Sequence, residues 1–581
     1  MIRRTFLKKT ALAGLSGFVL PRLGYASPVC NQEEILYNGI YLPEIWPPRN
    51  KEAAYMPMPV PYLNQPPEVI PIDVGRQLFV DNFLIQETGL ERKMHQARKL
   101  DINPIFKPET ELEQGQDNGS AVTPSDGGVW WDPKDKLFKM WYMAGRRYSM
   151  AYATSKDGIH WDRPQLDFDP GTNRILPGLA PDSTTVWLDH FTANPNERFK
   201  MFLRQNNDVL AGPNHYNTGW CMVSPDGIHW NEPVATGYCG DRSTIFYNPF
   251  RKKWIYSLRS RSEWTRSYGR SRFYHEHSDF LKGCKWTEDE PVFWTGADNL
   301  DIPDPEIGDK AELYNLSAVG YESIILGLHT ITVGPANQIN KENGIPRIND
   351  LKVSYSRDGF HLDRPDREAF IRAERKPGYW DRGYLHSVGG ICTIVGDQLR
   401  FYYSGIPGNP DKLNGKGEKI GHGSDGCTGI AVLRRDGFAS MSAGGKTGTL
   451  TTRPVTFKGE YLFVNVNCPD GQLKVEILDG DYSPIAPFSL ENCHPVSIDS
   501  TIQQVKWKKA ENLSSLKNKK VRFRFHLTKG DLYAFWVSPD KSGASMGFNA
   551  AGGPGFTGGI DTEGKNAYRE ANKILNNKRF I

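Results

Sequence analysis

The chain is poor in cysteine, carries little net charge and has no long apolar run after its first twenty residues. Its 581 residues include 8 cysteines, and the formal net charge is +4. Eight cysteines are too few for a fold built on disulfides, although Cys468 and Cys493 could pair in an exported chain. No later segment reaches the length of a membrane-spanning helix, so no membrane span is expected. The weak charge and the lack of a basic stripe with interleaved aromatics argue against nucleic acid as a partner.

Metal-binding motifs are equally scarce. The chain has no Cys-x-x-Cys, and its most histidine-rich run is His275-Glu276-His277. On a strand the two histidines would share one face, but no neighbouring residue completes a ligand set. A solvated strand end explains this run better than a metal site does. The sequence therefore predicts no metal in the active site and no required cofactor.

The first 26 residues have the features of an export signal. Residues Met1 to Lys9 match the twin-arginine pattern through Arg3 and Arg4, an apolar stretch follows over residues 11–20, and small residues end it at Ala26-Ser27. The apolar stretch is too short to span a membrane, so the segment is predicted to be a removable signal peptide. The mature protein is expected in the periplasm or outside the cell.

A short phrase recurs five times along the chain. It reads Ser-Lys-Asp-Gly-Ile-His-Trp from Ser155 and Ser-Pro-Asp-Gly-Ile-His-Trp from Ser224, with weaker copies from Ser278, Ser356 and Arg434. The anchoring aspartates are Asp157, Asp226, Asp279, Asp358 and Asp436. Asp-Gly between apolar runs is a signal for a hairpin turn, and we expect these aspartates to cap turns. Self-similarity on this scale indicates repeated supersecondary units.

Each copy follows a second hairpin signal, in which aromatic and β-branched runs flank Asn, Pro, Gly or Asp. Each repeat therefore predicts four strands, and four-stranded sheets repeated about an axis form a β-propeller. We predict an all-β protein with a five-bladed β-propeller over residues 75–442. The segment from Gln77 to Asp81 is the first convincing strand and could supply the outer strand that closes the ring.

The regions on either side of the repeats differ in composition. Residues 27–74 are Pro-rich and are expected to wrap over the surface, whereas residues 443–540 contain short runs of alternating polarity. Alternation at regular spacing is typical of an antiparallel β-sandwich. The tail, residues 541–581, is Gly-rich and then polar with weak helical character.

The innermost strand of each blade starts at one mouth of the channel, so we look for functional side chains just before those strands. These positions hold Asp126, Asp182, Asp241, Glu312 and His386. Loops at the same mouth add Arg146, Arg147, Arg259, Trp264 and His329, and Arg242 follows Asp241. Paired carboxylates perform glycoside hydrolysis, and aromatic rings beside guanidinium groups suit sugars. Each residue has a structural alternative, such as a turn residue for Asp126 and Asp182, a rim charge for Glu312 and a salt bridge for Arg242.

Five predicted blades, acids at the channel mouth and a trailing β-sandwich resemble the five-bladed glycoside hydrolases of families 32, 43 and 68. The motifs Arg76-Gln77-Leu78-Phe79-Val80-Asp81, Ser-x-Asp-Gly-x-x-Trp and Arg434-Arg435-Asp436-Gly437-Phe438 resemble uncharacterised bacterial proteins of the family-32-like kind. Those families order their acids as Asp, Asp and Glu on successive blades. The resemblance implies that Asp182 is the base or nucleophile, Asp241 a transition-state stabiliser and Glu312 the general acid. It also implies that His386 contacts substrate, water or a structural calcium in the central channel.

The signature of fructan enzymes, Asn-Asp-Pro-Asn-Gly, is absent, which argues against sucrose or fructan as substrate. We expect an exported glycoside hydrolase that cleaves terminal bonds of a plant, algal or microbial glycan, with an oligo- or polysaccharide as its partner. The first alternative is a non-catalytic carbohydrate-binding propeller. The second is a glycoside phosphorylase, which would need a phosphate site at the same mouth. The sugar, the linkage and the oligomeric state do not follow from the sequence.

Overall fold

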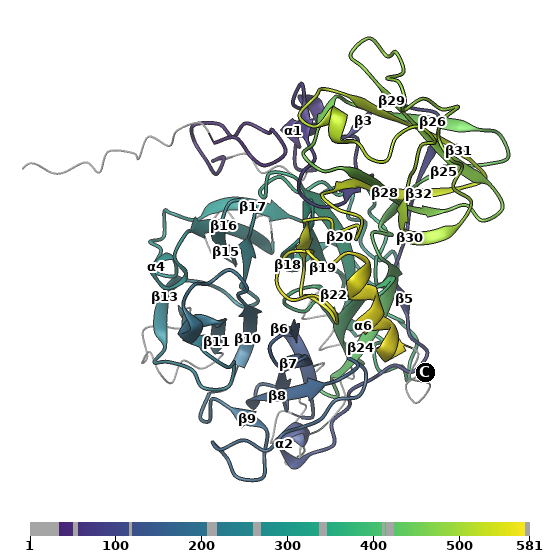
Figure 1. The fold of residues 1–581 in the computed structure, drawn as a ribbon. Coiled ribbons are helices and arrows are strands. Elements are labelled where there is room, and N and C mark those ends of the chain that lie inside the picture. Colours follow the sequence, from purple (N-terminus) through teal and green to yellow (C-terminus); the bar gives the residue numbers. More distant parts are fainter. Residues whose placement is uncertain are drawn as a thin grey trace, which may run out of the picture.

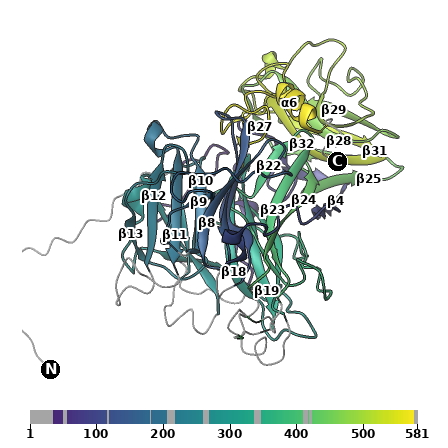
Figure 2. The ribbon, with the colours of Figure 1, turned by 90° about the horizontal axis from the view of Figure 1, so that it is seen from below.

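The computed structural model describes residues 34–49, 56–115, 119–179, 181–205, 218–259, 269–335, 346–408, 413, 417 and 423–575. This part of the chain is nearly all β and contains many sheets (Figures 1 and 2). Its helices are short: α1 (Pro61–Asn64), α2 (Glu111–Gln114), α4 (Phe280–Gly283) and α6 (Lys565–Leu575). Among the described residues, no helix is both long and apolar enough to cross a membrane. The predicted signal peptide lies outside the described residues.

The first three repeats form separate four-stranded antiparallel sheets, as the turn spacing predicted. The first sheet contains β6 (Val122–Asp132), β7 (Leu137–Ala144), β8 (Ser149–Ser155) and β9 (Arg174–Ile175). The second contains β10 (Pro181–Leu188), β11 (Phe199–Gln205), β12 (Thr218–Ser224) and β13 (Val234–Tyr238). The third contains β14 (Thr244–Asn248), β15 (Lys253–Leu258), β16 (Ser271–His277) and β17 (Val292–Gly296).

The fourth and fifth repeats share one nine-stranded sheet instead of two separate ones. The fourth supplies β18 (Glu312–Glu322), β19 (Ile324–Gly334) and β20 (Ile348–Ser356), and the fifth supplies β22 (Cys392–Val395), β23 (Gln398–Ile406) and β24 (Cys427–Arg434). The short strand β21 (Tyr384–His386) joins them, because it pairs in parallel with β20 and antiparallel with β23. The edges of the sheet are β33 (Phe548–Asn549) and β5 (Arg98–Lys99).

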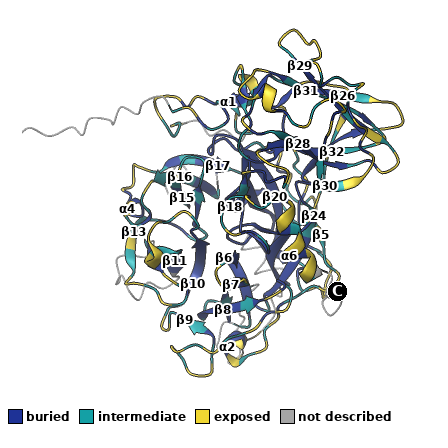
Figure 3. Ribbon diagram, in the orientation of Figure 1, coloured by how far each residue is buried: buried dark blue, intermediate teal, exposed yellow. Residues whose placement is uncertain are grey.

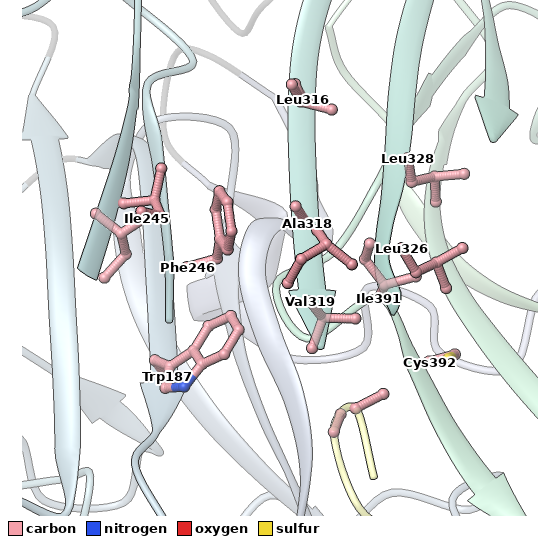
Figure 4. Packing of buried hydrophobic residues seen from close by; sticks show 14 of the residues in the cluster. Trp187, Ile245, Phe246, Leu316, Ala318, Val319, Leu326, Leu328, Ile391 and Cys392 are labelled. Atoms are coloured by element: carbon pink, nitrogen blue, oxygen red, sulfur yellow. The ribbon is translucent and has the colours of Figure 1, made fainter. Parts of the chain in front are cut away.

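The first strands of successive repeats pack side by side. Strand β6 contacts β10, β10 contacts β14, and β14 contacts β18, while β22 and β23 of the fifth repeat contact β6. Figure 4 shows Trp187 of β10, Phe246 of β14 and Val319 of β18 within one continuous hydrophobic core. The strands are mostly buried and the connecting loops are more exposed (Figure 3). This packing brings the starting ends of strands far apart in sequence close together.

The repeated turns lock neighbouring sheets to one another. Indole Nε1 of Trp141 donates to the Gly227 carbonyl at 2.6 Å, and Nε1 of Trp294 donates to the Phe360 carbonyl at 2.7 Å. The hydroxyl of Tyr402, in the fifth repeat, donates to the Gly158 carbonyl of the first at 2.9 Å. A side chain of one repeat thus satisfies a backbone oxygen in the turn of another, and the last repeat is tied to the first.

The turn aspartates Asp157, Asp226 and Asp358 act as predicted. Oδ1 of Asp358 accepts hydrogen bonds from the backbone of Phe360 and His361, both at 2.9 Å, and Oδ2 lies 2.6 Å from Nδ1 of His361. Asp226 makes the same contacts, but its side chain is 43% exposed, against 4% for Asp358.

We therefore expect Asp358→Ala to lower the free energy of unfolding by about 1–3 kcal/mol, because it leaves buried N–H groups without an acceptor. Asp226→Ala should cost less, because water can replace its acceptor. Urea unfolding of both variants would measure the difference. Equal losses in the two variants would contradict this account.

The other two aspartates of the repeat differ from the predicted turn caps: Asp279 caps a short helix, and Asp436 lies in a turn but its side chain is buried. Asp279 caps the short helix α4, accepting the backbone N–H of Lys282 at 2.9 Å. Asp436 has a φ of 60° and is fully buried, where it accepts the hydroxyl of Tyr321 at 2.6 Å and Nη1 of Arg76 at 2.9 Å. Its weaker copy of the phrase thus serves a buried polar cluster and not a solvent-facing turn.

Two further sheets share a second core (Figures 1 and 2). One contains β30 (Asp499–Gln504), β28 (Tyr461–Asn467), β32 (Gly530–Ser538), β25 (Ala439–Ala443), β4 (Glu91–Met94) and β2 (Gln77–Leu78). The other contains β29 (Gln472–Leu478), β31 (Arg522–Thr528), β26 (Gly448–Thr452) and β3 (Ile85–Thr88). The Pro-rich segment adds β1 (Ile70–Pro71) beside β27 (Val455–Thr456).

The pairing of β2 corrects the prediction for the Gln77 segment. This strand pairs with β32, in the two sheets that share the second core (the second body; the sheets of the five repeats are the first body). The outer position beside β24 is taken by β5. Strand β25 also crosses the predicted boundary at residue 442 and pairs with β32. Apolar alternation does not name a partner strand, so the sequence pattern could not distinguish these pairings.

The described cysteines are all free thiols, which corrects the suggested pair. Cys468 Sγ donates to the Val496 carbonyl at 3.3 Å, and Cys493 Sγ donates to the His494 carbonyl at 3.4 Å. Both side chains are buried in the second core, where a thiol behaves as a small apolar group.

Candidate functional site

Bulges interrupt the first strands of two repeats close to the candidate residues. Asp182 is the extra residue where the pairing of β10 with β11 shifts between Pro181 and Ser183. Tyr314 occupies the same place in β18, where the register shifts between Leu313 and Asn315. Arg242, just before β14, has a φ of 59°. A bulge redirects one side chain out of the alternating pattern, and bulges are common beside active sites.

Asp182 is buried and held by arginines. Its side chain is 2% exposed, with Oδ1 2.8 Å from Nη2 of Arg147 and Oδ2 2.7 Å from Nη1 of Arg204. Burial alone would raise the pKa of Asp182, but Arg147, Arg242 and Arg204 outweigh it and hold that pKa below its usual value. The carboxylate is therefore charged at neutral pH.

Asp241 and Glu312 are also ion-paired but reach solvent. Asp241 is 26% exposed and pairs with Arg259. Glu312 is 26% exposed, and its Oε2 lies 3.2 Å from Nη2 of Arg347 and 3.5 Å from Nε of Arg270. Two of the three candidate acids thus have partly exposed side chains.

Tyr314 lies among three arginines, a grouping that the sequence did not predict. The guanidinium carbons of Arg270, Arg347 and Arg242 lie 4.6, 5.4 and 6.0 Å from the centre of its ring. Burial would raise the pKa of Tyr314, but these arginines outweigh it and, with a hydrogen bond from Tyr384, lower the pKa to about 7. A phenol of this kind can hold or release a proton near neutral pH.

His386 and Arg146 belong to the same neighbourhood. The buried ring of His386 lies 5.3 Å from the ring of Tyr314 and 4.8 Å from that of Tyr384. Burial and the neighbouring charge of Arg147 lower the pKa of Arg146, while Tyr384, Tyr314 and Asp182 oppose the shift. Arg146 therefore interacts electrostatically with Tyr384, Tyr314 and Asp182.

The remaining predicted residues either lie away from this cluster or fall outside the described residues. His329 is a correction: it lies within β19, is 0% exposed, and its Nε2 is 2.8 Å from Oγ of Ser354. The expected loop is strand at this position, so His329 does not lie in a loop as predicted. The side chain of Asp126 and all of Trp264 lie outside the described residues.

The sequence reading missed Arg204, Arg270, Arg347, Tyr314 and Tyr384. In an up-and-down sheet the third strand starts at the same end as the first, and Arg270 and Arg347 directly precede β16 and β20. Applying the strand-start rule to third strands would have found both. Tyr314 gave no such signal, because a bulge cannot be recognised from alternation alone.

No metal centre accompanies this cluster in the described part of the chain. There, no group of three or more His, Cys, Asp or Glu side chains is arranged to hold an ion. Calcium in the channel therefore stays a prediction.

Comparison with known proteins gives no close relative. No family model and no curated protein matches the chain. Similar solved structures include an N-acetylgalactosamine deacetylase from F. plautii (TM-score 0.38, 14% identity, covering 59% of this chain and 95% of that one). They also include a putative glycoside hydrolase from Bacteroides ovatus (TM-score 0.36, 14% identity, 60% and 98%). A third is an exo-β-1,3-galactanase from Phanerochaete chrysosporium (TM-score 0.33, 10% identity, 77% and 99%). Likenesses this low do not carry a function, so the function must be argued from the site.

Proposed function

We propose that this chain is an exported glycoside hydrolase whose sheets form a five-bladed β-propeller followed by a β-sandwich. It would cleave terminal glycosidic bonds of a plant, algal or microbial glycan. One observation carries the proposal: Arg242 links the starts of the first strands of two neighbouring repeats. Its backbone N–H donates to Oγ of Ser183, next to Asp182, at 3.2 Å, and its guanidinium carbon lies 6.0 Å from the centre of the Tyr314 ring.

All three carboxylates are paired with arginines, so their different roles are proposed from the order of the acids along the chain. Asp182 stays ionised, which a base or nucleophile requires. Asp241 would stabilise charge on the sugar in the transition state. Glu312 would donate a proton to the leaving oxygen, and its side chain is 26% exposed. Tyr314, two residues after Glu312 in the chain, would relay a proton between Glu312 and the substrate.

A screen of the purified protein against aryl glycosides and natural oligosaccharides tests the proposal. Hydrolysis that Asp241→Asn abolishes would support it, and full activity of Asp241→Asn would overturn the site assignment. Sugar binding without turnover would favour the non-catalytic carbohydrate-binding alternative. Cleavage that depends on inorganic phosphate would favour the phosphorylase.

Glu312→Gln separates the acid role from simple binding. Glutamine keeps the shape but has no proton to donate, so we expect a large loss on substrates with poor leaving groups and a small loss on activated aryl glycosides. The measurement is kcat/KM on both substrate types for the variant and the wild type. Equal losses on both types would remove Glu312 from the acid role.

Export through the twin-arginine route is part of this proposal. Replacing Arg3 and Arg4 with lysine should leave the precursor in the cytoplasm, because the arginine pair is the part of the signal that the receptor reads. Fractionation and immunoblotting of cells that express each form would measure this. Normal periplasmic or secreted levels of the double variant would contradict it.

A further inference from the structure

A cavity of about 190 Å³ lies between the third and fourth repeats. Its walls come from β17, from residues 360–367 that follow β20, and from residues 56–59 of the N-terminal segment. The described residues that line it include none of the three candidate acids. A cavity of roughly 150 Å³ is enough to hold benzene, so this one has room for a six-membered ring with a short substituent.

Much of the wall is apolar and carries aromatic rings. Phe293, Trp294 and Phe360 line the cavity together with Met58 and Leu362. A hydrogen bond of 2.7 Å from Nε1 of Trp294 to the Phe360 carbonyl fixes two of these residues against each other. An apolar wall with a few polar groups is typical of small-molecule sites, and the faces of aromatic rings attract cations.

One charged residue of the wall lacks a counter-charge. The two arginines of the wall have carboxylate partners: Nη1 of Arg367 lies 2.8 Å from Oδ2 of Asp298, and Nη1 of Arg364 lies 2.8 Å from Oδ2 of Asp301. Asp363 also lines the cavity, and it forms no ion pair with any residue that the structure describes. A carboxylate in such surroundings is costly unless a cation accompanies it.

The surroundings of Asp363 also place its titration close to neutral pH. Burial and the nearby charge of Asp81 raise the pKa of Asp363 to about 6, against the opposing effects of the backbone N–H of Arg364 and of the charges of Arg367 and Arg92. Above this pH the carboxyl group is mostly ionised, and below it the group is mostly neutral.

We propose that this cavity binds a primary amine carried on a compact ring, with the ammonium group on Asp363 and the ring against the aromatic wall. The ammonium would supply the counter-charge that Asp363 lacks, and the ring would cover apolar side chains. An aromatic amine and an amino sugar share this chemistry. The site is separate from the candidate acids, so the proposal does not rest on the hydrolase function.

The experiment measures the binding of benzylamine and glucosamine against their neutral counterparts, benzyl alcohol and glucose, by calorimetry. Above the pH range in which Asp363 titrates, the wild type should bind at least one amine roughly tenfold more tightly than its counterpart, because a hydrogen bond to a charged group is stronger than one to a neutral group. A preference shown only by benzylamine would identify an aromatic amine, and one shown only by glucosamine an amino sugar.

Two variants test the location of the site. Asp363→Asn keeps the size of the side chain but removes its charge, so it should lose the preference for the amine. Gly296 lines the cavity, and a Cβ atom there would contact only Cβ of Ser271, at 3.6 Å. Gly296→Val therefore fills part of the space without a clash and should weaken the binding of the amine.

Asp167→Asn is the matched control, because it makes the same change at a side chain that is 71% exposed, and it should bind as the wild type does. Melting temperatures show that each variant is folded.

The pH dependence of binding gives a second readout. The amine needs the ionised carboxylate, and Asp363 takes up a proton as the pH falls through about 6, so the affinity should drop by about tenfold between about pH 7 and about pH 5. Equal binding of amines and neutral counterparts by the wild type would overturn the proposal. A preference for the amine that survives in Asp363→Asn would overturn it as well.

Discussion

Replacing Asp182 with asparagine should lower kcat/KM by about 10²–10⁴-fold on any accepted substrate. The substitution keeps the size of the side chain but removes the charge that Arg147, Arg204 and Arg242 hold in place. Asparagine cannot act as base or nucleophile, so the loss should appear mainly in kcat. Steady-state kinetics of the folded variant would measure it. Asp167→Asn, the same change at a side chain that is 71% exposed, is the control and should keep full activity.

Protonation of Asp182 should also set the acid limb of the pH profile of kcat/KM. Protonation of Asp182 should abolish activity, and because its pKa lies below the usual value, the limb of kcat/KM should lie at unusually low pH. Arg147→Gln removes one cause of that lowering and should move the limb to higher pH. An acid limb that does not move in Arg147→Gln, or full activity of Asp182→Asn, would remove Asp182 from the mechanism.

Replacing Glu322 with alanine should lower the free energy of unfolding by about 3–5 kcal/mol. Glu322 is fully buried, with Oε1 3.3 Å from Nε of Arg76 and 3.1 Å from Nη2 of Arg435. Its Oε2 accepts the hydroxyl of Ser545 at 2.7 Å. Alanine would leave two buried guanidinium groups with less compensation, which is costly because water cannot reach them.

This cluster ties the two bodies and the C-terminal tail together. Nη1 of Arg76 donates to the carbonyl of Thr501 in β30 at 2.8 Å, and Nη2 of Arg435 lies 3.2 Å from Asp561 in the tail. Loss of Glu322 should therefore destabilise both bodies in one transition. Chemical unfolding followed by tryptophan fluorescence would measure the change.

The controls for Glu322 differ in burial and in charge. Burial raises the pKa of Glu322 despite Arg76 and Arg435, so the neutral isostere in Glu322→Gln should cost less than alanine does. Glu368→Ala breaks the exposed pair with Arg372 and should change the free energy of unfolding by less than about 1 kcal/mol. A loss in Glu322→Ala as small as that in Glu368→Ala would show that the cluster does not hold the bodies together.

Local chemistry explains which predictions from the sequence were confirmed. The turns around Asp157, Asp226 and Asp358 formed as expected, because an aspartate that accepts backbone N–H groups two and three residues on needs only its own neighbours. The four-stranded sheets of the first three repeats follow from the same spacing. Asp182 and Glu312 lie at the starts of β10 and β18 and Asp241 lies shortly before β14, close to the strand starts that the spacing predicted, and their catalytic roles stay predictions.

The sequence by itself determined the β class, the repeats and the turns around Asp157, Asp226 and Asp358. Only the tertiary structure decided that β2 pairs with β32, that His329 is buried, and that arginines from several strands surround Tyr314. The physical reason is the distance along the chain over which each interaction acts. Turn and strand preferences act over a few residues, whereas strand partners, bulges and ion pairs depend on segments that meet only after the sheets have packed.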